Sequence, residues 1–243
     1  MSTTTEKVLL IVFGRTAAGK SMIGRYLSEQ KGFYHIEGSS VIKRETNEED
    51  AKQFESKRQY YSWLLNSRGF DLVEVAGVLP LVPNNSKIVY TGARTATGID
   101  TLYKELGRTR TKMMLMWVET DRNIRYGRAV ERKRDTDLHL ANFDDCDTDD
   151  FSRMWLVYGE LLADFIVVNN GTMRELSQKL DVVLSTDKCT TSGGAETLYR
   201  IEKSLYELDE LIQEVRLNEA LYNEACIIKK MLEKKCRICR TLF

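Results

Sequence analysis

Long hydrophobic runs, prolines and cysteines are all scarce in this chain. The first apolar run, Val8–Phe13, spans six residues, and no stretch approaches the ~20 apolar residues of a membrane helix, so we expect no membrane partner. With two prolines, the chain is expected to be mostly regular secondary structure. The five cysteines are irregularly spaced and follow no signal peptide, which predicts a cytoplasmic protein with free thiols. Cys236 and Cys239 form a lone C-x-x-C motif, whereas a zinc site needs two further ligands.

An excess of charge of one sign is also missing. Lys and Arg together number 36, and Asp and Glu together number 36, so the formal net charge is zero. This balance argues against a general nucleic-acid or membrane-surface binder, because such proteins gather basic residues. The 243 residues suffice for one α/β core and an appendage.

A phosphate-binding pattern, G-x-x-x-x-G-K-S, occupies residues 14–21. The apolar run Val8–Phe13 precedes it and a helix-compatible stretch follows it, which is the strand–loop–helix context that this pattern requires. Its glycines let successive backbone N–H groups point at phosphate oxygens, and the start of the helix adds partial positive charge. The residues predicted to bind nucleotide are Gly14, Arg15, Thr16, Ala17, Ala18, Gly19, Lys20 and Ser21.

Two side chains of this pattern indicate which molecules the site binds. The ammonium group of Lys20 can reach the β- and γ-phosphates, which makes it a candidate catalytic residue. The Ser21 hydroxyl is the expected metal ligand, for Mg²⁺. We therefore predict a nucleoside triphosphate site, with ATP and Mg²⁺ as the expected cofactors.

Short apolar segments alternate with helical ones up to about residue 184. We expect strands near 7–13, 33–37, 86–91, 113–118 and 164–168. We expect helices near 20–31, 40–67, 98–106, 121–134, 149–162 and 172–184, while segment 68–85 shows no clear period. Such alternation predicts an α/β fold of three layers, in which helices cover both faces of a parallel sheet of about five strands.

The pattern changes in the C-terminal part of the chain. Residues 185–195 are rich in Ser, Thr and Gly and are expected to form a linker after a domain over 1–184. Apolar residues then recur at helical spacing over 196–243, with a mostly acidic first half and a basic end. A helical hairpin satisfies this pattern, and so does pairing with a second copy in a homodimer. A solvated helix docked on the core is a further alternative.

An arginine-rich stretch over 121–135 follows the fourth expected strand. Arg125, Arg128 and Arg132 are spaced three and four residues apart and share one face of a helix. Guanidinium groups clamp phosphate oxygens, so this helix suits a lid over the transferred phosphoryl group. The alternative is a solvated basic helix that pairs with the acidic run over 144–150.

Four segments together resemble the P-loop nucleoside monophosphate kinase superfamily, and most of all its dephospho-CoA kinase-like branch. The order and spacing of the four carry the resemblance, which covers residues 7–184. The segments are the phosphate loop at 14–21, Val-Tyr-Thr-Gly-Ala-Arg-Thr at 89–95, Val-Glu-Thr-Asp-Arg-Asn-Ile-Arg-Tyr-Gly-Arg at 118–128, and Ala-Asp-Phe-Ile-Val-Val-Asn-Asn-Gly-Thr at 163–172.

The resemblance implies roles for several further residues. Arg94 would bind the phosphate or sugar of the acceptor. Arg125 and Arg128 would be catalytic lid arginines. Asn169 or Asn170 would lie near the nucleotide base, although an Asn-Asn-Gly sequence also forms an ordinary turn before a helix.

One expected acidic residue is missing from the family pattern. Many of these kinases carry an Asp after the second or third strand, whereas here the third expected strand ends without an acid. Glu37, after the second strand, is the candidate general base or indirect Mg²⁺ contact, and a surface glutamate is the alternative. Arg44 follows it within two helical turns and is a candidate for binding an anionic acceptor.

Two functions fit these residues. The first is ATP-dependent phosphoryl transfer to a small acceptor, such as a nucleoside monophosphate or a nucleoside-like compound. The second is a nucleotide-dependent switch or regulatory ATPase, with the C-terminal helices as a partner-binding arm. The arginine-rich helix favours the first function, and the missing strand-end acid favours the second.

Overall fold

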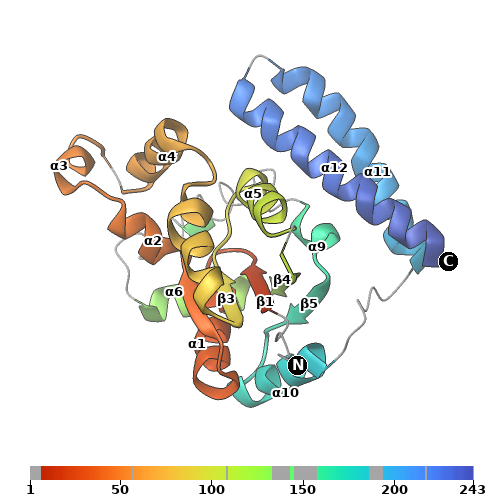
Figure 1. Cartoon of the computed structure of the whole chain (residues 1–243), viewed down its shortest axis with the longest axis horizontal. Coiled ribbons are helices and arrows are strands. Elements are labelled where there is room, and N and C mark those ends of the chain that lie inside the picture. Colours follow the sequence, from red (N-terminus) through yellow and green to blue (C-terminus); the bar gives the residue numbers. More distant parts are fainter. Residues whose placement is uncertain are drawn as a thin grey trace.

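Five parallel strands form the central sheet of the computed structural model, which describes residues 7–55, 57–107, 109–132, 143–144, 158–185, 194–216 and 218–242 (Figure 1). The strand order is β2-β3-β1-β4-β5, and each neighbouring pair is parallel. The strands are β1 (Lys7–Phe13), β2 (Tyr34–Glu37), β3 (Lys87–Thr91), β4 (Thr111–Glu119) and β5 (Phe165–Val168). All five lie where the sequence predicts strands.

The central strand β1 supplies apolar side chains to both faces of the sheet. Leu9 and Ile11 belong to one buried cluster, and Leu10 and Val12 belong to another, because successive residues of a strand point to opposite faces. The second cluster packs under α1 (Lys20–Lys31) and α10 (Met173–Ser185), and the first packs under α5 (Ala96–Leu106) and α9 (Gly159–Leu162). These are the three layers that the sequence predicts.

The predicted helix over 40–67 is wrong, because the structure breaks it into three. Asn47 accepts a hydrogen bond of 3.0 Å from the N–H of Glu49 and so starts a new helix, while its own N–H donates to the hydroxyl of Tyr60 at 3.0 Å. The three helices are α2 (Gly38–Arg44), α3 (Glu48–Ala51) and α4 (Lys57–Arg68).

The segment without a sequence period forms tight helical turns. A π-helix, η1 (Glu74–Val78), runs directly into a 3-10 helix, η2 (Leu79–Asn84), which contains both prolines of the chain. Glu74 is buried in this segment, at 1% exposure. Unusual helical turns of this kind leave no 3.6-residue pattern in a sequence.

The arginine-rich helix is α6 (Arg122–Arg132), which matches the expected helix within the described residues. Arg122 forms an ion pair with Asp144, the one member of the acidic run 144–150 that the structure describes. Of the helix expected over 149–162, the last turn, α9, lies in the described part of the chain.

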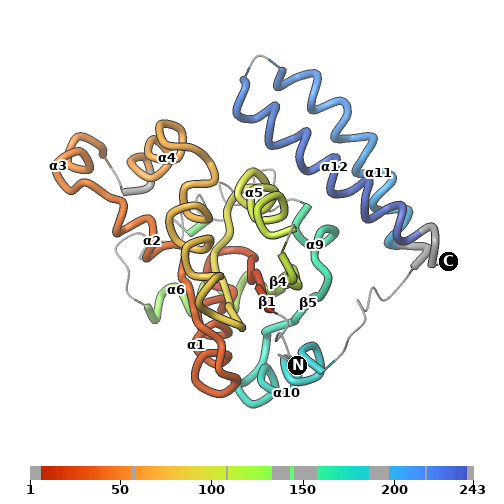
Figure 2. Tube along the Cα trace, viewed as in Figure 1, coloured from red at the N-terminus to blue at the C-terminus, as the bar shows by residue number. Residues whose placement is uncertain are grey.

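The C-terminal residues form two helices, α11 (Gly194–Val215) and α12 (Glu219–Leu242), which run side by side as a hairpin (Figures 1 and 2). Lys229 of α12 bonds to Asp209 of α11 at 2.6 Å, so the basic end does meet the acidic start. Apolar residues of both helices join the buried cluster that contains α5, among them Leu208 and Ile228. The boundary at 185–195 and the homodimer stay predictions.

No helix in the described part of the chain is both long enough and apolar enough to cross a membrane. Cys226, Cys236 and Cys239 are free thiols, and the latter two are buried. Among the described residues, no group of three potential ligands is placed to hold a metal ion through His, Cys, Asp or Glu alone.

Candidate active site

The phosphate loop connects the end of β1 with the start of α1, and its two glycines are required by its geometry. Gly14 has φ 147°, and a Cβ atom there would lie 2.6 Å from the carbonyl oxygen of Val118. Gly19 has φ 97°, and a Cβ atom there would collide with the side-chain amide of Asn169. The loop is therefore packed directly against the ends of β4 and β5.

The side chain of Lys20 folds back over the loop. Its ammonium group donates hydrogen bonds to the carbonyl oxygens of Gly14 at 2.8 Å and Arg15 at 2.7 Å. The positive charge is thus held at the loop, and its role toward the phosphates of a nucleotide stays a prediction.

Side chains outside the loop hold two of its carbonyl groups. Asn169 donates to the carbonyl oxygen of Ala18 at 2.8 Å, and Thr120 donates to the same oxygen at 3.1 Å. Arg125 donates to the carbonyl oxygen of Thr16 at 3.3 Å. Because the N–H of a peptide unit points away from its C=O, these bonds also fix the directions of the N–H groups that follow.

Arg125 is a buried residue, at 2% exposure. Besides its bond to Thr16, its Nε donates to the carbonyl oxygen of Thr120 at 3.0 Å, and its guanidinium lies 5.6 Å from the ring centre of Phe143. These contacts favour a role in supporting the loop. A catalytic role for Arg125 stays a prediction.

Arg128 lies one helical turn after Arg125 and has a different environment. Its Nη1 is buried without a hydrogen-bond partner among the described residues, and it lies 3.7 Å from the position of a Cβ atom on Gly19. Burial lowers the pKa of its guanidinium, although an arginine stays charged at neutral pH. A buried donor that lacks an acceptor beside a phosphate loop fits an anionic group such as a phosphate.

Ser21 and Glu37 meet at the carboxyl end of the sheet. The Ser21 hydroxyl donates to Oε1 of Glu37 at 2.8 Å, which joins the first turn of α1 to the end of β2. A hydroxyl and a carboxylate are the oxygen donors that Mg²⁺ prefers, so these residues fit the expected ion. The structure thus brings the predicted metal ligand and the candidate acid together.

The predicted acceptor residues lie on two different segments. Arg94 is exposed in the short loop between β3 and α5. Arg44 is 60% exposed, donates to the carbonyl oxygen of Ala76 at 2.9 Å and lies 3.4 Å from a carboxylate oxygen of Glu45. Arg44 thus binds the π-helical segment, and its role toward an acceptor stays a prediction.

The two candidate asparagines near the base differ in exposure. Asn169 is buried and holds the loop, while Asn170 is exposed and accepts a hydrogen bond of 2.9 Å from the N–H of Asp121. Asn170 is the member of the pair that remains available to a ligand.

Sequence reasoning missed Thr120 and Glu224. Thr120 is a buried hydroxyl between β4 and α6, and its place directly after a strand was the signal that could have found it. Glu224 lies in the tail, 7% exposed, and accepts hydrogen bonds from the N–H groups of Ala96 and Thr97. No local pattern in the sequence indicates that contact.

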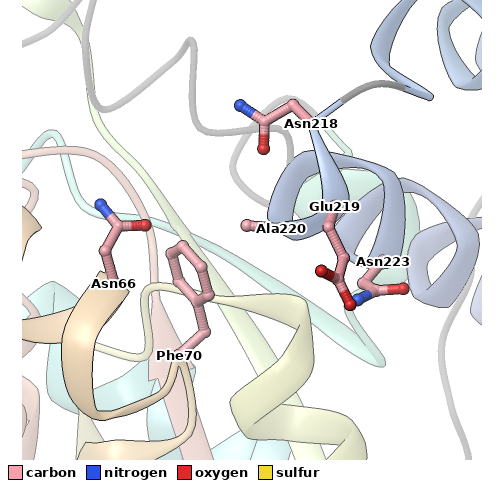
Figure 3. A pocket seen from close by; sticks show the side chains of 6 residues that line it. All are labelled: Asn66, Phe70, Asn218, Glu219, Ala220 and Asn223. Atoms are coloured by element: carbon pink, nitrogen blue, oxygen red, sulfur yellow. The ribbon is translucent and has the colours of Figure 1, made fainter.

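An open cleft of about 570 Å³ separates the end of α4 from the hairpin (Figure 3). None of the predicted site residues lines it, so it is separate from the predicted nucleotide site. Its lining residues are Asn66, Phe70, Asn218, Glu219, Ala220 and Asn223.

Several solved structures are similar to this chain in overall fold. A protein of Thermus thermophilus is 16% identical with a TM-score of 0.50, over 75% of this chain and 98% of its own. Shikimate kinase from Bacteroides thetaiotaomicron is 15% identical with a TM-score of 0.50, over 74% and 99%. Shikimate kinase from Acinetobacter baumannii, solved with shikimate, is 21% identical with a TM-score of 0.49, over 75% and 96%. The fold is that of the P-loop kinases.

The P-loop kinase fold confirms the fold class predicted from the sequence. These likenesses show the fold alone, and they give no support to the dephospho-CoA kinase-like branch. No model of a known protein family matches the sequence, and no curated protein does.

Proposed function

We propose that this P-loop protein is a kinase that transfers the γ-phosphoryl group of ATP to a small acceptor. The observation that carries the proposal is the buried Nη1 of Arg128, which lacks a partner beside Gly19 of a fully formed phosphate loop. A buried, unpaired donor costs ~1–3 kcal/mol, and a phosphate oxygen at this place removes that cost.

Binding of the triphosphate rests on the loop backbone and Lys20. The carbonyl groups of Thr16 and Ala18 are held from outside, so the N–H groups of the loop are oriented before the nucleotide arrives. Lys20 exchanges its two carbonyl partners for phosphate oxygens. Asn170, exposed beside the start of α6, is the proposed contact to the base.

Ser21 and Glu37 would hold Mg²⁺, which supplies neutralisation of the charge on the β- and γ-phosphates. The Ser21 hydroxyl is the proposed direct ligand. Glu37 would hold the ion indirectly or, for an acceptor that reacts through a hydroxyl, would accept its proton. Both tasks suit a carboxylate 2.8 Å from the Ser21 hydroxyl.

Arg128 acts on the charge that develops in the transition state. In a loose phosphoryl transfer, that charge spreads over the oxygens of the transferred group, and a positioned guanidinium stabilises it there. Arg125 contributes by keeping the loop in place. Removal of one such electrostatic contact costs on the order of 10² in turnover.

The acceptor is proposed to be a nucleoside monophosphate or a nucleoside-like compound. Arg94 and Arg44 are the proposed contacts to its anionic or sugar groups. Membership of the dephospho-CoA kinase-like branch is the narrower proposal and rests on the motif resemblance alone. One similar structure is a shikimate kinase with a TM-score of 0.50, so shikimate is a further acceptor to test.

A nucleotide-dependent switch is the second candidate function. It is favoured by the contact of Glu224 in the hairpin with the first turn of α5, because this contact links the C-terminal arm to a loop of the site. In that function the loop would sense nucleotide, and the arm would bind a partner.

An ADP-release assay separates the two functions. The purified chain is incubated with ATP and Mg²⁺ and with a panel of nucleosides, nucleoside monophosphates, dephospho-CoA and shikimate. Stimulation by one acceptor, lost in Lys20→Ala and kept in the surface control Lys31→Ala, supports the kinase. Slow hydrolysis that no acceptor stimulates supports the switch.

A further inference from the structure

Glu224 of the hairpin caps a helix that begins 128 residues earlier in the chain. Its carboxylate oxygens accept hydrogen bonds from the N–H groups of Ala96 at 2.7 Å and Thr97 at 2.8 Å, the first two residues of α5. These N–H groups have no partner within the helix, and Ala96 is fully buried. The negative charge also lies at the positive end of the helix dipole.

The residue before α5 completes the same cap. The hydroxyl oxygen of Thr95 accepts from the N–H of Gly98 at 3.2 Å and donates to the carbonyl oxygen of Phe70 at 2.6 Å. Together, Thr95 and Glu224 satisfy three consecutive N–H groups of the first turn. A buried helix end requires such partners.

Arg94 lies between this cap and the sheet. On its N-terminal side, Gly92 donates from its N–H to the carbonyl oxygen of Val12 at 3.0 Å. On its C-terminal side, Thr95 and Glu224 hold the start of α5. The backbone of Arg94 is therefore fixed by one anchor in the central strand and one in the C-terminal hairpin, whose helix α12 packs against α5 (Figure 1).

We propose that Glu224 is a positioning residue for Arg94, so that the C-terminal hairpin completes the acceptor side of the site. The inference rests on the proposed function, in which Arg94 binds the acceptor. It assigns the hairpin to acceptor binding and leaves nucleotide binding to the loop, because the loop carbonyls are held by Thr120, Arg125 and Asn169.

The variant Glu224→Gln tests this proposal with little change in volume. Gln keeps one oxygen acceptor and places an amide donor against the other N–H group. Glu214→Gln, at an exposed position of α11, is the matched control. In Glu224→Gln we expect kcat/KM for the acceptor found in the panel to fall ~10-fold or more, because small displacements of a binding group cost 10–100-fold. The ATP affinity of Glu224→Gln is expected to stay within about 2-fold of that of the unaltered chain. For Glu214→Gln, both ATP affinity and acceptor kcat/KM are expected to stay within the same limit.

A double-mutant cycle with Arg94→Ala separates positioning from a general loss of stability. If Glu224 acts through Arg94, then Glu224→Gln has no further effect on acceptor kcat/KM once Arg94 is removed. Additive losses in the double variant, or an unchanged kcat/KM in the single one, overturn the proposal.

Amide hydrogen exchange judges the proposal even if no acceptor in the panel is active. An inactive panel would contradict the proposed kinase function. The hydrogen bonds of Glu224 to the start of α5 would then be tested on their own. With ATP and Mg²⁺ as the only ligands, Glu224→Gln is expected to speed exchange of the Ala96 and Thr97 amides ~5-fold or more, as loss of a ~1 kcal/mol hydrogen bond implies. Exchange unchanged over 92–98 overturns the positioning role.

Discussion

The hydroxyl of Ser21 donates a 2.8 Å hydrogen bond to Oε1 of Glu37. The two residues lie at the start of α1 and at the end of β2, at the same edge of the sheet. This bond gives the candidate acid a position beside the predicted Mg²⁺ ligand, although the third strand carries no acid at its end. It makes Glu37 the first residue to test.

Glu37→Gln is expected to lower Mg²⁺-dependent turnover on the order of 10²-fold or more, because a carboxylate is replaced by a weaker, neutral ligand. Binding of ATP without Mg²⁺ is expected to change little. Calorimetric titration with and without Mg²⁺, together with ADP release, measures both quantities. Glu29→Gln, on the exposed side of α1, is the control, and equal losses in the two variants would remove Glu37 from the site.

Lys20→Ala is expected to abolish the rise in melting temperature that ATP produces, while the melting temperature without ATP stays nearly unchanged. A ligand stabilises a protein only in so far as it binds the folded state, and this variant loses the charge that faces the phosphates. Lys31→Ala serves as control because its ion pair with Asp181 lies at the surface. An ATP response that persists in Lys20→Ala would contradict the phosphate-loop assignment.

Arg128→Ala and Arg125→Ala are expected to fail in different ways. Arg128→Ala should lower kcat on the order of 10²-fold, far more than it weakens ATP binding, because the guanidinium acts mainly in the transition state. Arg125→Ala should lower stability by ~2–4 kcal/mol, because it removes the guanidinium donor from the buried carbonyl group of Thr120 and from the half-buried carbonyl group of Thr16. Urea unfolding and steady-state kinetics distinguish them. The same phenotype in both variants would contradict these separate roles.

Glu74 is expected to make stability depend on pH. Burial raises its pKa to about 7, above the ordinary value near 4.5, although the hydroxyl of Tyr90 donates to its carboxylate at 2.7 Å. At pH values between 4.5 and about 7, the carboxyl group of Glu74 is protonated in the folded state and ionised in the unfolded state. Stability therefore falls as pH rises through this range. Over this pH range, the titration of Glu74 lowers the free energy of unfolding by ~3 kcal/mol.

Glu74→Gln keeps an acceptor for Tyr90 and removes the titration. We therefore expect the stability of the variant, relative to the unaltered chain, to improve by ~3 kcal/mol between pH 4.5 and pH 8. Urea unfolding at both pH values measures this difference. A difference that does not change with pH would show that another group controls the behaviour.

Deletion of the residues after Thr186 tests the predicted domain boundary. The phosphate loop, the sheet and α6 precede this position, so ATP binding is expected to survive. The apolar face beneath the hairpin would be exposed and α5 would lose its cap, so we expect a lower melting temperature and self-association. Sedimentation of both chains also tests the homodimer. A truncated chain that cannot bind ATP would show that the tail belongs to the core.

The nucleotide half of the site was accessible from the sequence because its signals are local. The loop pattern, the strand before it and the helix after it lie within residues 7–31, and helical spacing placed Arg125 and Arg128 on one face. The structure then distinguished these two arginines. Arg125 donates hydrogen bonds to backbone carbonyl groups, whereas Nη1 of Arg128 has no partner among the described residues. Such a difference depends on the packing of α6 against the loop, which no spacing rule contains.

The proposed acceptor side, and the segments around it, were not accessible in the same way. Asn47 interrupts the predicted helix over 40–67 through a cap that depends on Tyr60 of the next helix. Glu74 lies in a π-helical turn without a period, and Glu224 meets α5 across 128 residues. These contacts arise from tertiary structure, and the sequence carries only weak local traces of them.

Glu224, which caps α5, lies 128 residues after the start of that helix, and this separation matters during synthesis on the ribosome. The residues that hold the carbonyl groups of the phosphate loop, Thr120, Arg125 and Asn169, have all been synthesised by position 169. The N–H groups of Ala96 and Thr97 gain their partner only with Glu224, 55 residues later. At translation rates of ~5–20 residues per second, this interval lasts roughly 3–11 seconds. If the loop binds ATP as proposed, we expect a nascent chain to bind it during this interval, before the loop that carries Arg94 has reached its final form.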